Sequence, residues 1–255
     1  MFARRDIMKG AATLPLAAIL ADPLLARAAA EMTEDVKLTL DDGQSVTAAV
    51  IYPEVTPAPA VLLIHEWWGL NDQIKAVAAE LAREGYVAVA VDLYQGKVAS
   101  NGDEAGQYMK AVKPETATTT LEKWISWTRE NEKTTDNLGT IGWCFGGGWA
   151  LNASIAAPTE ATIVYYGSVA RDAAQLKELK GPVMGHFAEN DKWINKEMVD
   201  GFIEQMKAAG QPAPEVFWYD ADHAFANPSG ARYDQEDAQL AWSRSLEFFN
   251  TNLKG

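Results

Sequence analysis

The stretch Gly142-Trp143-Cys144-Phe145-Gly146-Gly147-Gly148 follows an apolar run, Leu138–Gly142, and precedes a run of small residues that ends at Pro158. G-x-C-x-G between a strand and a helix is the nucleophile-elbow pattern with cysteine in place of serine. A sharp turn there would lift the Cys144 side chain above the sheet, and the flanking glycines let neighbouring backbone approach closely. At a helix N-terminus the amide dipoles would favour the thiolate. The alternative is a glycine-rich turn around a buried structural thiol.

Outward from this turn, short apolar runs alternate with helix-like stretches along the chain. The periodicity predicts helices over Gln73–Glu84, Leu121–Asn131, Gly146–Ala157 and residues 194–209 and 235–250. It predicts strands over Val36–Leu40, Val46–Ile51, Ala60–Ile64, Tyr86–Val91, Leu138–Gly142, Thr162–Tyr166, Val183–Phe187 and Glu215–Tyr219. The first two strands flank Asp41-Asp42-Gly43, a hairpin signal. This alternation predicts a single α/β domain over residues 31–255, with a mostly parallel sheet of about eight strands and helices on both faces.

The charge balance and the cysteine count limit the partners that we expect. The chain has 22 Lys and Arg against 35 Asp and Glu, a formal net charge of −13. An anionic surface repels phosphate backbones, so no nucleic-acid partner is expected. The single cysteine, Cys144, cannot form an internal disulfide. No pair of histidines stands at metal-ligand spacing, so we expect no metal. We also expect no cofactor, and a monomer that acts on a small molecule.

Residues 1–30 have the layout of an export signal, with a basic start, an apolar middle and a small-residue end. Arg4-Arg5 resembles the start of a twin-arginine signal, and Ala28 and Ala30 each end an A-x-A cleavage pattern. The apolar middle, residues 11–21, is too short to span a bilayer comfortably. We expect a periplasmic or exported protein without stable membrane insertion after the signal is removed. The alternative is an uncleaved amphipathic start or a membrane anchor.

A thiol nucleophile needs a base to accept its proton and an acid to orient that base. His223 lies just past the last predicted strand, where a catalytic loop would emerge, whereas His186 lies inside an apolar run and is expected in the core. Asp191 also follows a strand, and the order Cys144, Asp191, His223 is the order nucleophile, acid, base. Asp222 is the rival acid. A solvated loop carboxylate is the alternative interpretation of Asp191.

The stretch Ile64-His65-Glu66-Trp67-Trp68-Gly69 follows the third predicted strand, where the second donor of an oxyanion hole is placed. We expect the backbone N–H groups of Trp67 and Phe145 to form that hole. Glu66 would lie beside it, or else point outward into a salt bridge. The substrate pocket is expected to be lined by Trp68, His65, Trp143 and Asn227. For His65 a structural hydrogen bond is the alternative role.

These motifs together closely resemble the dienelactone hydrolase family of the α/β-hydrolase fold, over nearly all of residues 31–255. They are H/Q-E-x-x-G at His65–Gly69, G-x-C-x-G-G at 142–147, the Asp191 loop and H-A-F at 223–225. The resemblance implies carboxymethylenebutenolidase-like activity through a Cys144, His223 and Asp191 triad. Lactone or ester opening would form a thioester that water later hydrolyses. The resemblance also implies that Glu66 contacts the resting thiol and is displaced when substrate binds.

The sequence departs from the family at two substrate-binding positions. One anchoring arginine is expected after the fourth strand, but it has no counterpart in Gln95–Val112, and Arg232 lies off the family pattern. In the best-known members an arginine four residues after the catalytic histidine helps to hold the substrate carboxylate, and Asn227 stands at that position here. Apolar or aromatic esters are therefore an alternative to an anionic dienelactone, in line with Trp67, Trp68, Trp143 and Trp149. A non-catalytic binding protein on the same scaffold is a further alternative. A thiol redox sensor is disfavoured because no second cysteine could resolve an oxidised thiol.

Overall fold

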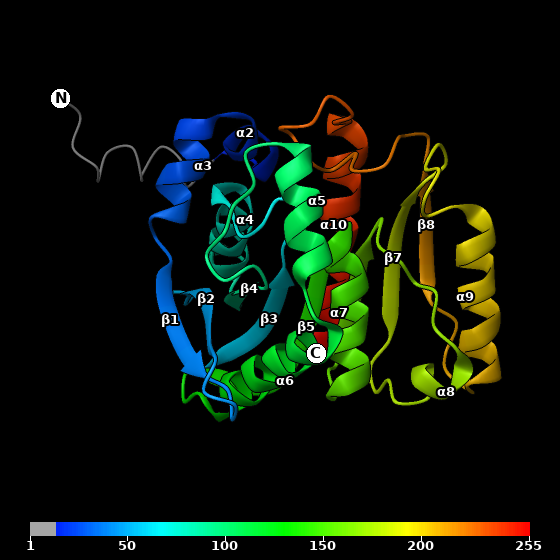
Figure 1. The fold of residues 1–255 in the computed structure, drawn as a ribbon, viewed down its shortest axis with the longest axis horizontal. Coiled ribbons are helices and arrows are strands. Elements are labelled where there is room, and N and C mark those ends of the chain that lie inside the picture. The colour runs from blue at the N-terminus through cyan, green and yellow to red at the C-terminus, as the bar shows by residue number, and fades with distance from the viewer. Residues whose placement is uncertain (1–13) are drawn as a thin grey trace.

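The computed structural model describes residues 14–255, and an eight-stranded sheet forms its centre (Figure 1). The strands are β1 Glu34–Thr39, β2 Ser45–Ile51, β3 Ala58–Ile64, β4 Val87–Asp92, β5 Thr134–Trp143, β6 Ala161–Tyr165, β7 Val183–Ala188 and β8 Glu215–Tyr219. They are ordered β1-β2-β4-β3-β5-β6-β7-β8. The β1–β2 hairpin pairs antiparallel to β4, and the strands from β4 to β8 run parallel. The predicted mostly parallel sheet and its hairpin are confirmed.

Helices cover both faces of the sheet. Helices α4 Asp72–Arg83 and α10 Gln235–Leu253 pack on one face, and α6 Pro114–Glu130, α7 Phe145–Ala156 and α9 Lys196–Ala208 pack on the other (Figure 1). Side chains of β3 contribute to the core on both faces of the sheet, because successive side chains of a strand point to opposite faces. Val61 and Leu63 join the core under α4 and α10, whereas Leu62 and Ile64 join the core under α6.

Two stretches of helix were not expected from the sequence. Helix α5 spans Gly102–Ala111, and α6 begins at Pro114, well ahead of the predicted start at Leu121. Each has a weak apolar signal, because α5 buries Ala105 alone and the first turn of α6 buries only Ala117. Capping explains their starts: the Asn101 side chain accepts the Glu104 N–H at 3.0 Å, and proline is favoured in a first helical turn. A short helix, α8 Ala173–Leu176, was also missed.

Part of the N-terminal segment folds onto the domain. Helices α2 Leu16–Ala21 and α3 Pro23–Ala30 pack against α4, where Ile19 and Ala26 are buried beside Ala76. The basic residues of the expected signal, Arg4, Arg5 and Lys9, lie outside the described residues. Within residues 14–255, no helix combines the length and the apolar character needed to cross a membrane.

The strand order places a binding crevice between β3 and β5. The chain moves from β3 outward to β4 and then returns to the opposite side of β3 to form β5. Ligands of open α/β sheets bind outside the carboxyl ends of the strands where the order reverses in this way. In this protein those ends carry His65-Glu66 after β3 and Cys144 after β5.

Candidate active site

Cys144 occupies the turn between β5 and α7 with φ 54° and ψ −117°. Positive φ is unfavourable for a residue that carries a Cβ, and it persists only where the surroundings enforce it. A Cβ on Gly142 would collide with the carbonyl of Gly146, and a Cβ on Gly146 would collide with the carbonyls of Ile64 and His65. Glycine is therefore required at both positions, and the chain has the strand–turn–helix geometry of a nucleophile elbow.

The structure brings together the three residues expected to form the triad. His223 Nε2 lies 3.2 Å from Cys144 Sγ, and His223 Nδ1 lies 2.6 Å from Asp191 Oδ2. The Asp191 side chain is fully buried and that of His223 is 12% exposed. Asp222, the rival acid, is exposed and is not the hydrogen-bond partner of His223.

The ionised carboxylate of Asp191 orients the His223 ring. Burial alone would raise the pKa of Asp191, but hydrogen bonds from His223 and from the N–H groups of Ile194 and Trp193 outweigh it and hold the pKa below its usual value. Those amides donate to Oδ1 at 3.0 and 2.8 Å. An ionised carboxylate only accepts hydrogen bonds, so Nδ1 of His223 carries the proton and Nε2 faces the sulfur as an acceptor.

The thiol is held in its protonated form. Burial raises the pKa of Cys144 to about 12, with a further contribution from the negative charge of Glu66. The Phe145 N–H acts in the opposite direction but does not offset burial. The expectation that the helix N-terminus would favour a resting thiolate is therefore wrong, because desolvation of the sulfur outweighs the amide dipoles. Cys144 needs His223 to remove its proton.

Glu66 points into the protein rather than outward into a salt bridge. Its side chain accepts hydrogen bonds from Tyr166 Oη at 3.1 Å and from Asn227 Nδ2 at 2.5 Å. Burial raises the pKa of Glu66, and hydrogen bonds from Asn227 and Tyr166 act against that rise. The family resemblance implied a contact between Glu66 and the resting thiol; within residues 14–255 Cys144 is hydrogen-bonded to His223 and no hydrogen bond joins Glu66 to the sulfur, so that contact stays a prediction. Glu66 influences the sulfur through its charge.

The two expected oxyanion donors lie on backbone segments that touch. Phe145 N–H begins α7 and is close enough to the sulfur to lower the pKa of Cys144. The Trp67 N–H follows Glu66 in the loop after β3, and within residues 14–255 it has no hydrogen-bond acceptor. Gly146 packs against the carbonyls of Ile64 and His65, which brings this loop next to the elbow. The Trp67 and Phe145 amides therefore lie on the two segments from which an oxyanion hole would be built.

His65 joins two loops by hydrogen bonds and does not line the substrate pocket. It is fully buried. Its Nε2 accepts the Leu93 N–H at 3.1 Å, so its Nδ1 carries the proton and donates to the Glu66 carbonyl at 2.6 Å. Burial lowers the pKa of His65, which keeps it neutral and preserves this pattern. The pocket assignment of His65 is wrong, because its two ring nitrogens are used in hydrogen bonds that join the loop after β3 to the loop after β4.

Two of the other expected pocket residues line a small cavity. Trp143 and Asn227 border a space of about 30 Å³ together with Glu66 and, from the N-terminal segment, Leu20. Trp68 does not border it; its ring packs edge-on against Trp67 with centroids 5.0 Å apart. The expected role of Trp68 in a substrate pocket stays a prediction. His186, expected in the core, is fully buried and hydrogen-bonded to Tyr219 and Ser245.

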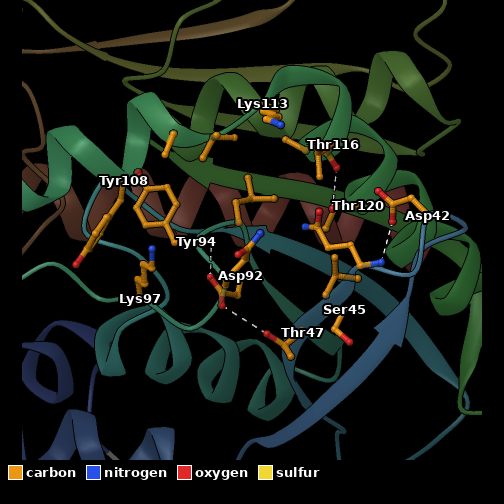
Figure 2. A pocket seen from close by; sticks show the side chains of 17 residues that line it. Asp42, Ser45, Thr47, Asp92, Tyr94, Lys97, Tyr108, Lys113, Thr116 and Thr120 are labelled. Carbon is orange, nitrogen blue, oxygen red and sulfur yellow. Dashed lines mark hydrogen bonds between the residues drawn. The ribbon is translucent and has the colours of Figure 1, made fainter.

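A larger cavity of about 310 Å³ lies away from the triad (Figure 2). Figure 2 shows Thr47 from β2, Asp92 from the end of β4, and Tyr108 and Thr116 from α5 and α6 around it. Asp92 is occupied by hydrogen bonds from the Tyr94 and Gly96 amides. None of Cys144, Asp191 and His223 borders this cavity.

Three residues beside the triad had not been singled out as site residues from the sequence. The Tyr166 and Trp193 rings each lie 5.3 Å from the His223 ring, measured between centroids. Arg232, noted in the sequence only as lying off the family pattern, stands over Trp193, with its guanidinium carbon 5.8 Å from the ring centroid. Their positions after β6, after β7 and before α10 are compatible with the carboxyl edge of the sheet, but residue type alone gave no signal.

The chain is similar to known proteins in sequence and in fold. The model of the dienelactone hydrolase family matches residues 46–253. A carboxymethylenebutenolidase from Pseudomonas putida is 26% identical over 232 residues, covering 85% of this chain and 96% of the relative. A crystal structure of a dienelactone hydrolase-like promiscuous phosphotriesterase from metagenomic libraries has a TM-score of 0.78 at 19% identity, covering 87% and 99% of the two chains. The Thermogutta terrifontis esterase Est2 has a TM-score of 0.67 at 17% identity, covering 87% and 93%.

Proposed function

The chain belongs to the dienelactone hydrolase family, and we propose that it opens esters or lactones through a thioester on Cys144. The observation that carries this proposal is the hydrogen-bonded series from Asp191 to His223 to Cys144. Such a series has the geometry required of an acid, a base and a nucleophile in covalent catalysis. The protein is a carboxymethylenebutenolidase-like hydrolase, and the roles of individual residues are our proposal.

Acylation begins when Cys144 gives its proton to His223 Nε2 and its sulfur attacks the carbonyl carbon. The carbonyl oxygen gains the negative charge and is stabilised by the Phe145 and Trp67 N–H groups, each worth about 2.7–4 kcal/mol in a preorganised hole. The carbon–oxygen bond of the ester then breaks, and His223 returns the proton to the leaving oxygen. The product is an alcohol and a thioester on Cys144.

Deacylation repeats these steps with water. His223 takes a proton from the water as the water oxygen attacks the thioester carbonyl carbon. The carbon–sulfur bond breaks, the acid leaves, and the sulfur regains its proton. Asp191 stays ionised throughout and stabilises the imidazolium that forms twice in each cycle.

The substrate that this site favours is neutral around Glu66. The amide of Asn227 carries no charge, and its Nδ2 is already engaged by Glu66. A substrate carboxylate placed there would face the negative charge of Glu66. This supports apolar or aromatic acyl groups, in agreement with Trp143 at the same cavity.

The test of the proposed function is turnover of phenyl acetate by the wild type and Cys144→Ala. We expect the substitution to abolish turnover and leave the melting curve unchanged. Rapid quenching of the wild type should trap one acetyl group on Cys144, found by peptide mass spectrometry. Full turnover by Cys144→Ala, or tight binding of esters without turnover by the wild type, would contradict the proposal.

We also propose that residues 1–30 direct export through a twin-arginine-like route. Arg4-Arg5, the apolar stretch and the A-x-A endings support it. The test replaces Arg4 and Arg5 together with lysine, which keeps both charges. Export should fail in that variant, and the exported wild type should begin near Glu31. An exported protein that begins at Met1 would contradict cleavage.

A further inference from the structure

Trp193 is a large apolar side chain that the fold leaves in solvent beside the catalytic imidazole. It is 62% exposed, and its ring meets the His223 ring at 74° with centroids 5.3 Å apart. Its backbone N–H donates to Asp191 Oδ1 at 2.8 Å, so the carboxylate that holds His223 also positions Trp193. An indole fixed in place beside a catalytic base provides an apolar contact surface that loses little conformational entropy on binding.

Arg232 adds a positive charge to the same surface. Its guanidinium carbon lies 5.8 Å from the Trp193 ring centroid, and the residue is exposed. Among residues 14–255, no carboxylate lies within ion-pair distance of it. Burial dominates the pKa of Cys144, and the charge of Arg232 acts against that effect, so the guanidinium is close enough to influence the reacting sulfur.

The chemistry of acylation decides which part of an ester meets this surface. His223 must return its proton to the leaving oxygen as the carbon–oxygen bond breaks, so that oxygen lies within hydrogen-bond reach of Nε2. The group attached to the leaving oxygen is therefore next to the imidazole, where Trp193 lies with Arg232 over its ring. The acyl group is on the other side of the same carbonyl carbon, bonded to the sulfur.

We propose that Trp193 and Arg232 form a leaving-group subsite that selects aryl esters, above all those whose aromatic alcohol carries a negative charge. The inference rests on the proposed function and adds to it the class of alcohol released. The ring of the alcohol stacks on or against Trp193, and its anionic substituent pairs with Arg232. The proton moves from His223 Nε2 to the phenolate oxygen, and the thioester remains on Cys144.

The test compares two esters that carry the same ring on opposite sides. Phenyl acetate has it on the alcohol, and trifluoroethyl benzoate has it on the acyl group with an activated alkyl alcohol. The parameter kcat/KM reports the steps up to acylation. For each ester the ratio of kcat/KM in the variant to that in the wild type is compared, because the intrinsic reactivity of the ester cancels in this ratio. Trp193→Ala should lower kcat/KM for phenyl acetate about five- to tenfold and leave the benzoate within twofold. Trp193→Phe should recover most of the loss.

The charged half of the subsite is tested with meta-carboxyphenyl acetate against phenyl acetate. Arg232→Gln should remove a preference of about three- to tenfold for the charged ester, and added salt should reduce that preference in the wild type. Lys180→Gln, which removes a positive charge just before β7 at the opposite edge of the sheet, is the matched control and should change neither ester.

Two kinds of failure are distinguishable. Equal effects of Trp193→Ala on phenyl acetate and on the benzoate, or a larger effect on the benzoate, would overturn the subsite while leaving the hydrolase intact. Unchanged preference for the charged ester in Arg232→Gln would overturn the role of the guanidinium. Hydrolysis of both esters by Cys144→Ala at the wild-type rate would instead overturn the proposed function.

Discussion

Replacing Gly146 with alanine tests the contact on which the oxyanion hole depends. The added Cβ would collide with the carbonyls of Ile64 and His65. Both obstacles are backbone atoms, so the side chain cannot be accommodated by a rotamer change. The loop that carries the Trp67 N–H must move away by about 1 Å, a displacement that can reduce catalysis on the order of 100-fold.

The expected magnitude follows from the donor that is lost. Removal of one oxyanion donor lowers kcat by about 10²–10³, so Gly146→Ala should fall in that range. Overpacking should also lower the free energy of unfolding by about 1–3 kcal/mol. The Cys144–His223 pair lies outside the collision, so the rate of Cys144 alkylation by iodoacetamide should stay within a few-fold of the wild type.

Gly148→Ala is the matched control two residues further along α7. A Cβ there would have its nearest contact with the Ser168 carbonyl at 3.3 Å, which a small shift relieves. Alanine is favoured over glycine in a helix by about 1 kcal/mol, so this variant should keep its stability and its kcat. The assay is steady-state hydrolysis of phenyl acetate, with urea unfolding of each variant. Wild-type kcat in a folded Gly146→Ala protein, or an equal loss in Gly148→Ala, would refute the reasoning.

Four further variants probe charge and hydrogen bonding around the triad. Asp191→Asn should lower kcat by about 10⁴ because the imidazole loses its orienting charge, whereas Asp222→Asn should leave kcat nearly unchanged; comparable losses would contradict the assignment. The pKa of Asp191 is lowered in the folded state, so its contribution to stability is present above pH 3.8 and is lost as pH falls through the folded pKa. Acid unfolding of the two variants measures this loss. Glu66→Gln should accelerate Cys144 alkylation near pH 8 by removing a negative charge. Because burial raises the pKa of Glu66, the variant should also gain stability over the wild type as pH rises above 4.5, and no gain between pH 4.5 and 8 would count against that burial effect. His65→Ala should lower the free energy of unfolding by about 2–4 kcal/mol, since it removes a buried side chain and leaves the Leu93 N–H unpaired. A urea-measured loss under about 1 kcal/mol would show that the two loops need no such tie.

The prediction of elements succeeded where burial is strong and failed where it is weak. Strand β4 is buried along its whole length and β3 at every residue but Pro59, and their apolar runs stand out in the sequence. Helix α5 is mostly exposed, so its residues carry little apolar periodicity and only the Asn101 cap marks its start. A sequence pattern detects an element in proportion to the apolar surface that the element buries.

The same division applies to the site. The sequence predicted Cys144, Asp191 and His223 as a triad, because each follows a strand in the order that this chemistry needs, and Cys144 and His223 meet across 79 residues of chain. The role of His65 could not be chosen from the sequence, since both a pocket wall and a structural hydrogen bond suit a histidine at the end of a strand. The acceptor and donor that its two nitrogens meet, Leu93 and Glu66, decide the question.

The sequence by itself predicted the α/β class of the domain and the three residues that the structure brings together, because hydrophobic periodicity, glycine spacing and the order of motifs along the chain can be seen in the sequence. Only the tertiary structure decided how those groups are charged and what surrounds them. Cys144 is protonated because folding removes water from its sulfur and places Glu66 nearby. Trp193 lies beside His223, with Arg232 over its ring, because segments distant in sequence meet at one edge of the sheet. Desolvation and long-range contact depend on the packed molecule as a whole, and no short stretch of sequence encodes them.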